Sequence, residues 1–393
     1  MSKTRISRMA VPVGAALALT AAGCAGSAVD SGGDDEGPIR IGAVLDITGA
    51  GAQLAAPQKN ALEMLVDQLN EDGGVDGREV EVIIRDNQSE EDVAAREMNS
   101  LVNEENVDIV FGASRTGPSL AMREIAEENE IPMISLAANI AIIDDAEWIF
   151  KTAQNDSIVL ERMLDYVEGQ GWETAGLMRD SSGFGEGVEE TIEELGAERG
   201  VELIGTERFT PDATDFTAQT VNIRDLDADV NFIWGIPPSA SLAQVAYDDL
   251  DIETPLVQSH GIGEDEFLET AGAAANGIVF PIGRILVADQ LPDDDPQAEV
   301  IQSFHADYVE EFGSNPSTFA GHAWDAFHLS VDAFEEVGTD PHEVRDYLES
   351  VEGFVGITGT FNMSPEDHSG LGTDALVYVT VEDEEFVLMD EQD

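Results

Sequence analysis

Basic residues and cysteine are scarce in this chain of 393 residues. Only 18 lysines and arginines stand against 81 aspartates and glutamates, so the net charge at pH 7 is −63. Such a charge repels nucleic acids and anionic membrane surfaces, and neither is an expected partner. The single cysteine, Cys24, excludes an intrachain disulfide, and the six histidines form no HExxH pair. These absences argue against a metal enzyme, and we expect no metal or cofactor.

The acidic residues are spread along the whole chain and do not form one block. Self-repulsion of this size destabilises a compact protein unless salt screens it, and the Debye length falls to about 3 Å at 1 M ionic strength. We therefore interpret the composition as adaptation to a saline or alkaline environment. An acidic protein with a cationic partner is the alternative interpretation.

The short motifs of common enzymes are also missing. The sequence has no G-x-S-x-G nucleophile motif, no phosphate-binding P-loop and no thiol outside Cys24. The segment 183–187 (GFGEG) lacks the spacing of a dinucleotide-binding fingerprint. The segment 225–231 (DLDADVN) has Val230 where a calcium loop needs glycine. We therefore predict that the protein is not an enzyme.

The N-terminus has the features of a secretory signal. Residues 1–8 contain three basic side chains and no acid, and residues 9–22 are small and apolar. Fourteen residues are too few to cross a bilayer as a helix, which needs about 20. The segment 21–24 (AAGC) resembles a bacterial lipobox, although Ala21 stands where leucine is usual. The resemblance implies that residues 1–23 are a lipoprotein signal peptide and that Cys24 is acylated.

The segment that follows supports an anchored protein. Residues 24–38 are rich in glycine, serine and aspartate, a composition typical of a flexible tether. The only cysteine of the chain lies at the processing site, which favours lipidation. Ordinary secretion with an incidental cysteine is the alternative.

From Pro38 onward, short apolar runs alternate with amphipathic segments. This alternation predicts βα units and parallel sheets, and the strands are too many for one sheet of usual size. We expect an α/β fold in two lobes. The expected strands are 39–45, 79–85, 107–111, 132–135, 174–178, 202–208, 230–234 and 255–258, followed near the C-terminus by 359–363, 374–380 and 385–389. The expected helices are 59–70, 92–103, 118–128, 155–170, 187–198, 218–225, 241–249, 294–312, 317–337 and 341–350.

A series of short motifs, in a fixed order, carries a family resemblance. They are IGA at 41–43 with TG at 48–49, LNEDGGVDGR at 69–78, RDNQS at 85–89, VDIVFG at 107–112, IPMIS at 131–135, FG at 184–185, HAWDA at 322–326, and DH at 367–368 with GL at 370–371. Through them the chain resembles the branched-chain amino-acid-type (leucine/isoleucine/valine-binding) periplasmic solute-binding proteins of ABC transporters, from Ile39 to about Met389.

The resemblance implies a type I periplasmic binding protein fold. Two Rossmann-like, doubly wound lobes are joined by a three-stranded hinge and hold the ligand between them. Lobe one would comprise 39–156 and 283–355, and lobe two 157–282 and 356–393. The implied function is capture of a small carboxylate-bearing solute, either a branched-chain or other amino acid or an aromatic or organic acid.

The same resemblance implies the partners and the location. The protein would deliver its solute to an ABC permease and ATPase complex. It would be a monomer held at the outer face of the cell membrane only by its lipid anchor. A ligand-sensing receptor of the same fold, feeding a signalling partner, is the first alternative, and a secreted α/β enzyme is the second.

The loop at 112–117 (GASRTG) is the first candidate site, and Pro118 behind it opens an expected helix. Free N–H groups at a helix N-terminus, together with the helix dipole, form an anion site. The resemblance implies that the ligand carboxylate binds here, with Thr116 at the hydroxyl position. Ser114 and Arg115 would add a donor and a positive charge. Simple helix capping is the alternative.

The segment 135–139 (SLAAN) follows an expected strand end, where ligands bind in open α/β sheets. By resemblance it is the second ligand loop, with Ala137, Ala138 and Asn139 as binding residues. Asn139 stands where amino-acid binders often have threonine.

Two aromatic residues are candidates in the second lobe. Phe184 stands where many relatives have tyrosine, and Trp234 ends an expected strand. We expect both to bind ligand, and burial in the core is the alternative for each.

His260 marks a departure from the family pattern. By resemblance, relatives that bind α-amino acids usually hold the ligand ammonium with an acid at this place. A neutral histidine does not replace that charge, and an unpaired ammonium is costly in a closed site. We therefore expect His260 to bind a ligand that lacks an α-ammonium. A small shift in alignment, with Glu264 or Asp265 holding the ammonium, is the alternative.

Overall fold

The computed structural model describes residues 37–389. The expected signal peptide, the lipidation site Cys24 and all but the last two residues of the tether lie outside this range. Within it, no helix combines the length and apolar character that crossing a membrane requires.

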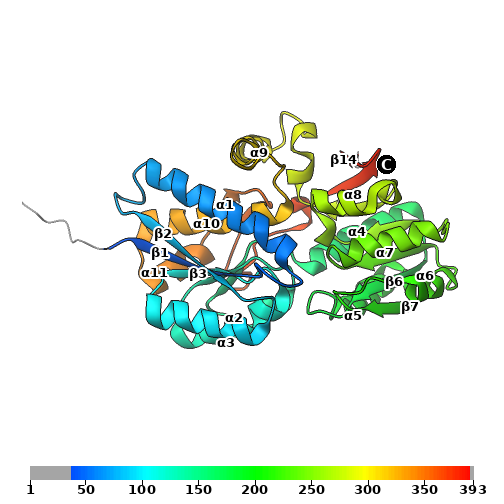
Figure 1. Ribbon diagram of the computed structural model, residues 1–393, viewed down its shortest axis with the longest axis horizontal. Helices are drawn as coiled ribbons and strands as arrows, with labels where there is room; N and C mark the ends of the chain where they lie inside the picture. Colours follow the sequence, from blue (N-terminus) through cyan, green and yellow to red (C-terminus); the bar gives the residue numbers. More distant parts are fainter. Residues whose placement is uncertain (1–36, 390–393) are drawn as a thin grey trace, which may run out of the picture. The chain divides into compact units, whose positions relative to one another are not determined.

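The first lobe is built on a parallel five-stranded sheet with the order β2-β1-β3-β4-β5. Helices from the first part of the chain cover both faces, and three helices from much later in the sequence join them (Figure 1). The strands are β1 (Ile39–Leu45), β2 (Val80–Asp86), β3 (Ile109–Gly112), β4 (Met133–Ser135) and β5 (Ile149–Lys151). The helices are α1 (Ala52–Glu71), α2 (Glu91–Ser100) continued by a π-helical turn η1 (Leu101–Glu105), α3 (Thr116–Asn129), α9 (Ala298–Phe312), α10 (Thr318–Val337) and α11 (Pro341–Glu349).

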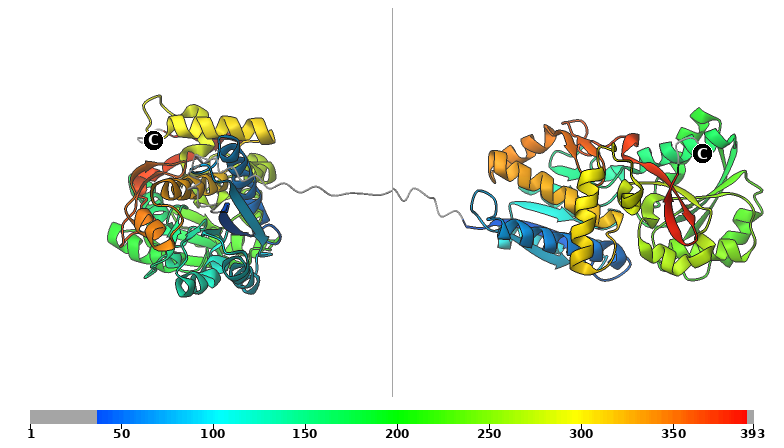
Figure 2. Two further views of the ribbon diagram at one scale, coloured as in Figure 1. Left: turned by 90° about the vertical axis from the view of Figure 1, so that its left-hand side faces the viewer. Right: turned by 90° about the horizontal axis from the view of Figure 1, so that it is seen from above.

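The second lobe is built on a seven-stranded sheet with the order β14-β13-β10-β9-β8-β6-β7. Its first five strands in sequence are parallel, and the C-terminal hairpin extends the sheet in antiparallel fashion beside β10 (Figure 2). The strands are β6 (Thr174–Asp180), β7 (Glu202–Phe209), β8 (Val230–Trp234), β9 (Leu256–Gln258), β10 (Val279–Ile282), β13 (Val377–Glu382) and β14 (Glu385–Leu388). The helices are α4 (Asp156–Gln170), α5 (Val188–Arg199), α6 (Thr217–Arg224), α7 (Ser239–Asp249) and α8 (Asp265–Ala271).

Shorter elements complete the described chain. A separate two-stranded sheet pairs β11 (Glu352–Val355) with β12 (Thr360–Asn362). Five 3₁₀ turns lie between the main elements of residues 37–389: η2 (Ile140–Ile142), η3 (His260–Ile262), η4 (Gly272–Ala275), η5 (Arg284–Gln290) and η6 (Thr373–Ala375).

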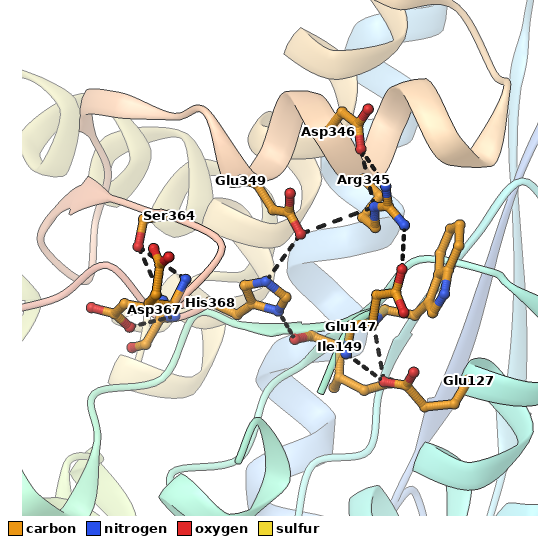
Figure 3. Close-up of polar contacts among 12 residues, drawn as sticks. Glu127, Glu147, Ile149, Arg345, Asp346, Glu349, Ser364, Asp367 and His368 are labelled. Atoms are coloured by element: carbon orange, nitrogen blue, oxygen red, sulfur yellow. Dashed lines mark hydrogen bonds and ion pairs between the residues drawn. The ribbon is translucent and has the colours of Figure 1, made fainter. Parts of the chain in front are cut away.

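The chain passes between the lobes three times, after β5, after β10 and after β12. The first and third crossings are bonded to each other, because Lys151 N donates to the His368 carbonyl at 3.1 Å and His368 Nδ1 lies 2.8 Å from the Ile149 carbonyl (Figure 3). Glu349 of α11 lies 3.4 Å from His368 Nε2 on the other side of the ring. The two-lobed α/β fold is thus confirmed, and the lobe boundaries given above remain a proposal.

Most expected elements are present within a few residues of their predicted bounds. The sequence analysis missed β5, β10, β11 and α8, which are short and have little polar alternation to mark them. It also began the helix of the first candidate site too late. That helix starts at Thr116, so Pro118 is its third residue and not its first.

Candidate functional site

A cavity of about 390 Å³ lies between the two sheets, at the carboxyl ends of their parallel strands. Pockets of this size hold small molecules, and this edge of an open sheet is where ligands bind. Its walls come from both lobes. They include Leu54 of α1, residues 114–118 after β3, Leu136 and Ala138 after β4, residues 181–184 after β6, Ile236 after β8, His260 and Gly261 after β9, and Phe319 and His322 of α10.

The polar end of the cavity is the loop after β3. Gly112 ends that strand with φ 115°, and a Cβ there would lie 2.1 Å from the Val44 carbonyl oxygen, so only glycine fits. The chain then turns directly into α3, whose N-cap Arg115 makes no side-chain capping bond. Since neither Ser114 nor Thr116 caps α3, the capping alternative does not describe this loop. The helix N-terminus and the buried Thr116 side chain line the cavity instead.

Ser114 is fixed by Asp46 at the end of β1. Its Oγ accepts a hydrogen bond from Asp46 N at 3.2 Å, and its own N donates to Asp46 Oδ2 at 3.1 Å. Burial raises the pKa of the Asp46 carboxyl, and hydrogen bonding from Asn87 and the charge of Arg115 oppose that rise. The Ser114 hydroxyl keeps its own proton available for a group in the cavity.

Arg115 is the cation of this site. It lines the cavity, and no ion pair or hydrogen bond of its guanidinium is found among residues 37–389. It lies near Asp46 of the first lobe and Asp180 of the second. Burial raises the pKa of both carboxyls, and the charge of Arg115 opposes part of that rise. A guanidinium with unused donors beside a helix N-terminus is well suited to a carboxylate.

Only part of the second expected ligand loop lines the cavity. Ala138 lines the cavity, and its carbonyl accepts a hydrogen bond from the buried Lys151 Nζ, which also donates to Asn155 Oδ1 at 2.5 Å. Ala137 and Asn139 are not part of the lining. Asn139 Nδ2 instead donates to the Gly183 carbonyl of the other lobe at 3.0 Å. This residue joins the two lobes beside the cavity.

The two aromatic candidates have different places. Phe184 lines the cavity, whereas Trp234 is fully buried behind it, with the ring centroids 5.2 Å apart. Trp234 Nε1 donates to the Phe184 carbonyl at 3.0 Å. Trp234 ends a central strand of the sheet, so its side chain enters the core of the lobe and positions Phe184.

His260 lines the cavity and is 4% exposed. Burial, with smaller contributions from His322 and Lys151, lowers its pKa to about 3, so the imidazole is neutral at ordinary pH. Glu264 and Asp265, considered as alternative partners for an ammonium, do not line the cavity. Asp265 accepts a hydrogen bond from Asn315 Nδ2 at 3.0 Å on the outer surface.

The carboxylates that do line the cavity lie at its rim. They are Glu91 and Glu186, both exposed, and no buried acid is part of the lining within residues 37–389. The deep wall is apolar and aromatic, with Leu54, Ile236 and Phe319 forming one packed cluster against Phe184. The cavity therefore combines a cationic end with an apolar body.

Sequence reasoning missed His322, Phe319 and Leu54 as parts of the wall. His322 belongs to a motif that was noted for the family resemblance, but nothing in that motif indicates that α10 returns to the cavity. Burial, then the charge of Lys151, lowers the pKa of His322 to about 3, with the Leu136 backbone opposing the shift.

The lobes are in contact around the cavity. A Cβ on Gly183 would lie 3.1 Å from Thr116 Cγ2, and Thr318 N donates to the Gly263 carbonyl at 3.1 Å. A further hydrogen bond joins Gln53 Nε2 to the Glu266 carboxylate. No group of three or more histidine, cysteine, aspartate or glutamate side chains suited to a metal ion occurs in the described part of the chain.

Comparison with known proteins decides the family. Residues 38–384 match the model of the periplasmic binding protein family. The chain belongs to this family. Its members are periplasmic or extracellular binding proteins, which agrees with the expected extracytoplasmic location.

Individual relatives of this periplasmic binding protein are distant in sequence but cover nearly the whole chain. The Leu/Ile/Val-binding protein homolog 2 of Brucella abortus is 22% identical over 357 residues, 88% of this chain and 92% of the relative. An extracellular ligand-binding receptor from Rhodopseudomonas palustris superposes with a TM-score of 0.84 at 26% identity, over 90% of this chain and 100% of the receptor. The substrate-binding protein LivJ of Streptococcus pneumoniae, solved with isoleucine, superposes with a TM-score of 0.79 at 25% identity, also over 90% and 100%.

Proposed function

We propose that this protein is the extracytoplasmic, lipid-anchored receptor of an ABC importer. It binds a small carboxylate-bearing solute between its lobes and presents it to a membrane permease. The observation that carries the proposal is the unpaired guanidinium of Arg115 beside the uncapped N-terminus of α3, in a partly open cavity whose wall is more apolar than polar. Such an arrangement favours a single carboxylate oriented toward Arg115.

The cavity favours a carboxylate without an α-ammonium. The relatives named above include Leu/Ile/Val-binding proteins and a protein that holds isoleucine. An amino acid brings an ammonium that needs an acidic partner in a water-poor site. Here His260 and His322 are neutral, and the acids of the lining are exposed at the rim. An aromatic or aliphatic organic acid fits this wall better than a branched-chain amino acid.

Transport is favoured over catalysis by what the cavity contains. Its polar side chains suit binding and orientation, and no serine or cysteine nucleophile motif adjoins it. The signal sequence, the lipobox-like Cys24 and the tether support an anchored receptor that meets a permease as a monomer.

The test is isothermal titration of the mature chain, begun at Ala25, in high salt. The panel contains leucine, valine, other amino acids, and aromatic and aliphatic carboxylates. We expect binding of at least one unaminated carboxylate while the amino acids give no heat. Tight binding of leucine or valine would contradict the proposed ligand class but keep the receptor. Turnover of a bound solute would contradict the receptor itself.

A further inference from the structure

Two buried histidines face the cavity from opposite lobes. His260 lies in η3 after β9, and His322 lies near the start of α10. Their side chains are 4% and 3% exposed. Within residues 37–389, Nδ1 of His260 and both ring nitrogens of His322 make no hydrogen bond of good geometry, although the Leu136 backbone lies close enough to the His322 ring to oppose the lowering of its pKa. Buried polar groups of proteins are nearly always paired, so these nitrogens are available to a ligand.

Both rings are held in place by their neighbours. The His260 ring makes T-shaped contacts with Phe184 and Trp234, with centroids 5.6 and 5.7 Å away. The His322 ring lies edge-on to Phe319 at 5.9 Å, and its backbone carbonyl accepts a hydrogen bond from Thr152 Oγ1 at 2.8 Å. Neither imidazole is free to turn out to solvent and satisfy its nitrogens there.

The charge state of the pair restricts what it binds. Burial, with a smaller contribution from the charge of Lys151, lowers the pKa of each ring to about 3, so both are neutral. A neutral imidazole offers one donor and one acceptor. When one ring presents its N–H and the other its lone pair, an ammonium, which only donates, or a carboxylate, which only accepts, satisfies one of the two rings. A hydroxyl donates and accepts at once and brings no charge into the apolar wall.

We propose that His260 and His322 form a hydroxyl-recognition subsite, so that the solute is a small hydroxy-carboxylate with an apolar body between its two polar groups. The inference rests on the proposed function, because the acid group of the same molecule binds at Arg115. Arg115 and Thr116 line the same cavity as the two imidazoles, and its wall also contains the apolar side chains of Leu136 and Phe319.

Titration with matched ligand pairs tests the subsite in the unaltered mature protein. The probes are benzoate and 4-hydroxybenzoate, phenylacetate and 4-hydroxyphenylacetate, 3-phenylpropionate and its 4-hydroxy derivative, and hexanoate and 6-hydroxyhexanoate. Their lengths differ, so the span of the cavity need not be known beforehand. In the pair of best length, we expect the hydroxylated acid to bind at least about tenfold tighter, because the unhydroxylated acid leaves both imidazoles unpaired.

The outcomes separate this inference from the proposed function. If both members of each binding pair have equal affinity, or the unhydroxylated acid is tighter, the subsite is refuted while the carboxylate receptor stands. If no carboxylate in the series binds, both are refuted.

A variant tests whether the preference for the hydroxylated acid depends on His322. His322→Phe keeps a ring of similar shape but removes both nitrogens, and we expect it to bind the two acids of the best pair equally. His305→Gln, on α9 and outside the cavity, should keep the wild-type preference. Preserved discrimination in a folded His322→Phe protein, checked by circular dichroism, would contradict the role of His322.

Discussion

The side-chain amide of Asn139 donates a 3.0 Å hydrogen bond to the Gly183 carbonyl and thereby joins the ligand loop of one lobe to the first loop of the other. A second bond, from Ala141 N to Asn139 Oδ1 at 2.9 Å, fixes the orientation of the amide. Asn139 does not line the cavity. It is a positioning residue that favours the closed arrangement of the lobes.

Replacing this residue should weaken binding without changing selectivity. Asn139→Ala removes both hydrogen bonds, of which the one to Gly183 joins the lobes, so ligand affinity should fall roughly fivefold for every ligand alike. Titration calorimetry measures the effect. Asn129→Ala is the matched control, since its amide bonds only to the Ile125 carbonyl within its own helix. A change in ligand preference would show instead that Asn139 contacts the solute.

Arg115 should dominate the affinity for the acid group. Arg115→Gln removes the unpaired guanidinium at the cavity, and we expect carboxylate binding to weaken roughly 10- to 100-fold. The exposed Arg96, which pairs with Glu97 on α2, supplies the control variant Arg96→Gln. Equal affinities of the two variants, measured by calorimetry at one salt concentration, would contradict the placing of the carboxylate.

The neutral histidines should make the protein less stable in mild acid. The pKa of His322 is about 3 in the folded chain and 6.5 without its surroundings. Below pH 6.5 the unfolded chain therefore binds a proton that the folded chain does not, and stability falls as the pH falls toward 3. Above pH 6.5 this contribution is constant.

Replacing His322 isolates its share of that loss. Between pH 7.5 and pH 5 the wild type should lose about 2 kcal/mol more unfolding free energy than His322→Phe. Denaturant titrations in high salt at the two pH values measure the difference. Identical losses in both proteins would mean that His322 is protonated in the folded state.

Asp325 should be important for stability and not for ligand choice. Its buried carboxylate accepts from Ile357 N at 2.6 Å and Thr358 N at 2.8 Å, which holds the turn before β12 against α10. Asp325→Ala leaves two buried N–H groups unpaired and should cost about 3 kcal/mol. Thermal unfolding in high salt should show a clear fall for this variant. Asp332→Ala, on the same helix beside Glu335 and Glu336, should have little effect or be mildly stabilising.

Residues that directly follow strands could be predicted from the sequence. The segment after β3 and the loops that carry Phe184 and His260 each come at the carboxyl end of a strand that the apolar pattern reveals, and the structure brings all three to one cavity. The fold class could be predicted for the same reason, because regular alternation of strands and helices leaves few other architectures.

Side-chain direction and distant packing could not be predicted. Asn139 and Trp234 contact residues of the wall but do not line the cavity, and the backbone pattern does not distinguish such neighbours from lining residues. His322 enters the site on a helix from the late part of the chain, so its place depends on how α10 packs on the first lobe. That packing is a property of the tertiary structure.

The central claim is that this cavity binds a carboxylate and has no partner for an α-ammonium. The most direct test compares leucine with 4-methylpentanoate, which has the same carbon skeleton and lacks only the amine, by calorimetry on the mature protein in high salt. We predict that 4-methylpentanoate binds more tightly than leucine. Tighter binding of leucine would contradict the account, since it would require an ammonium partner in a wall whose acids among the described residues, Glu91 and Glu186, are exposed at the rim.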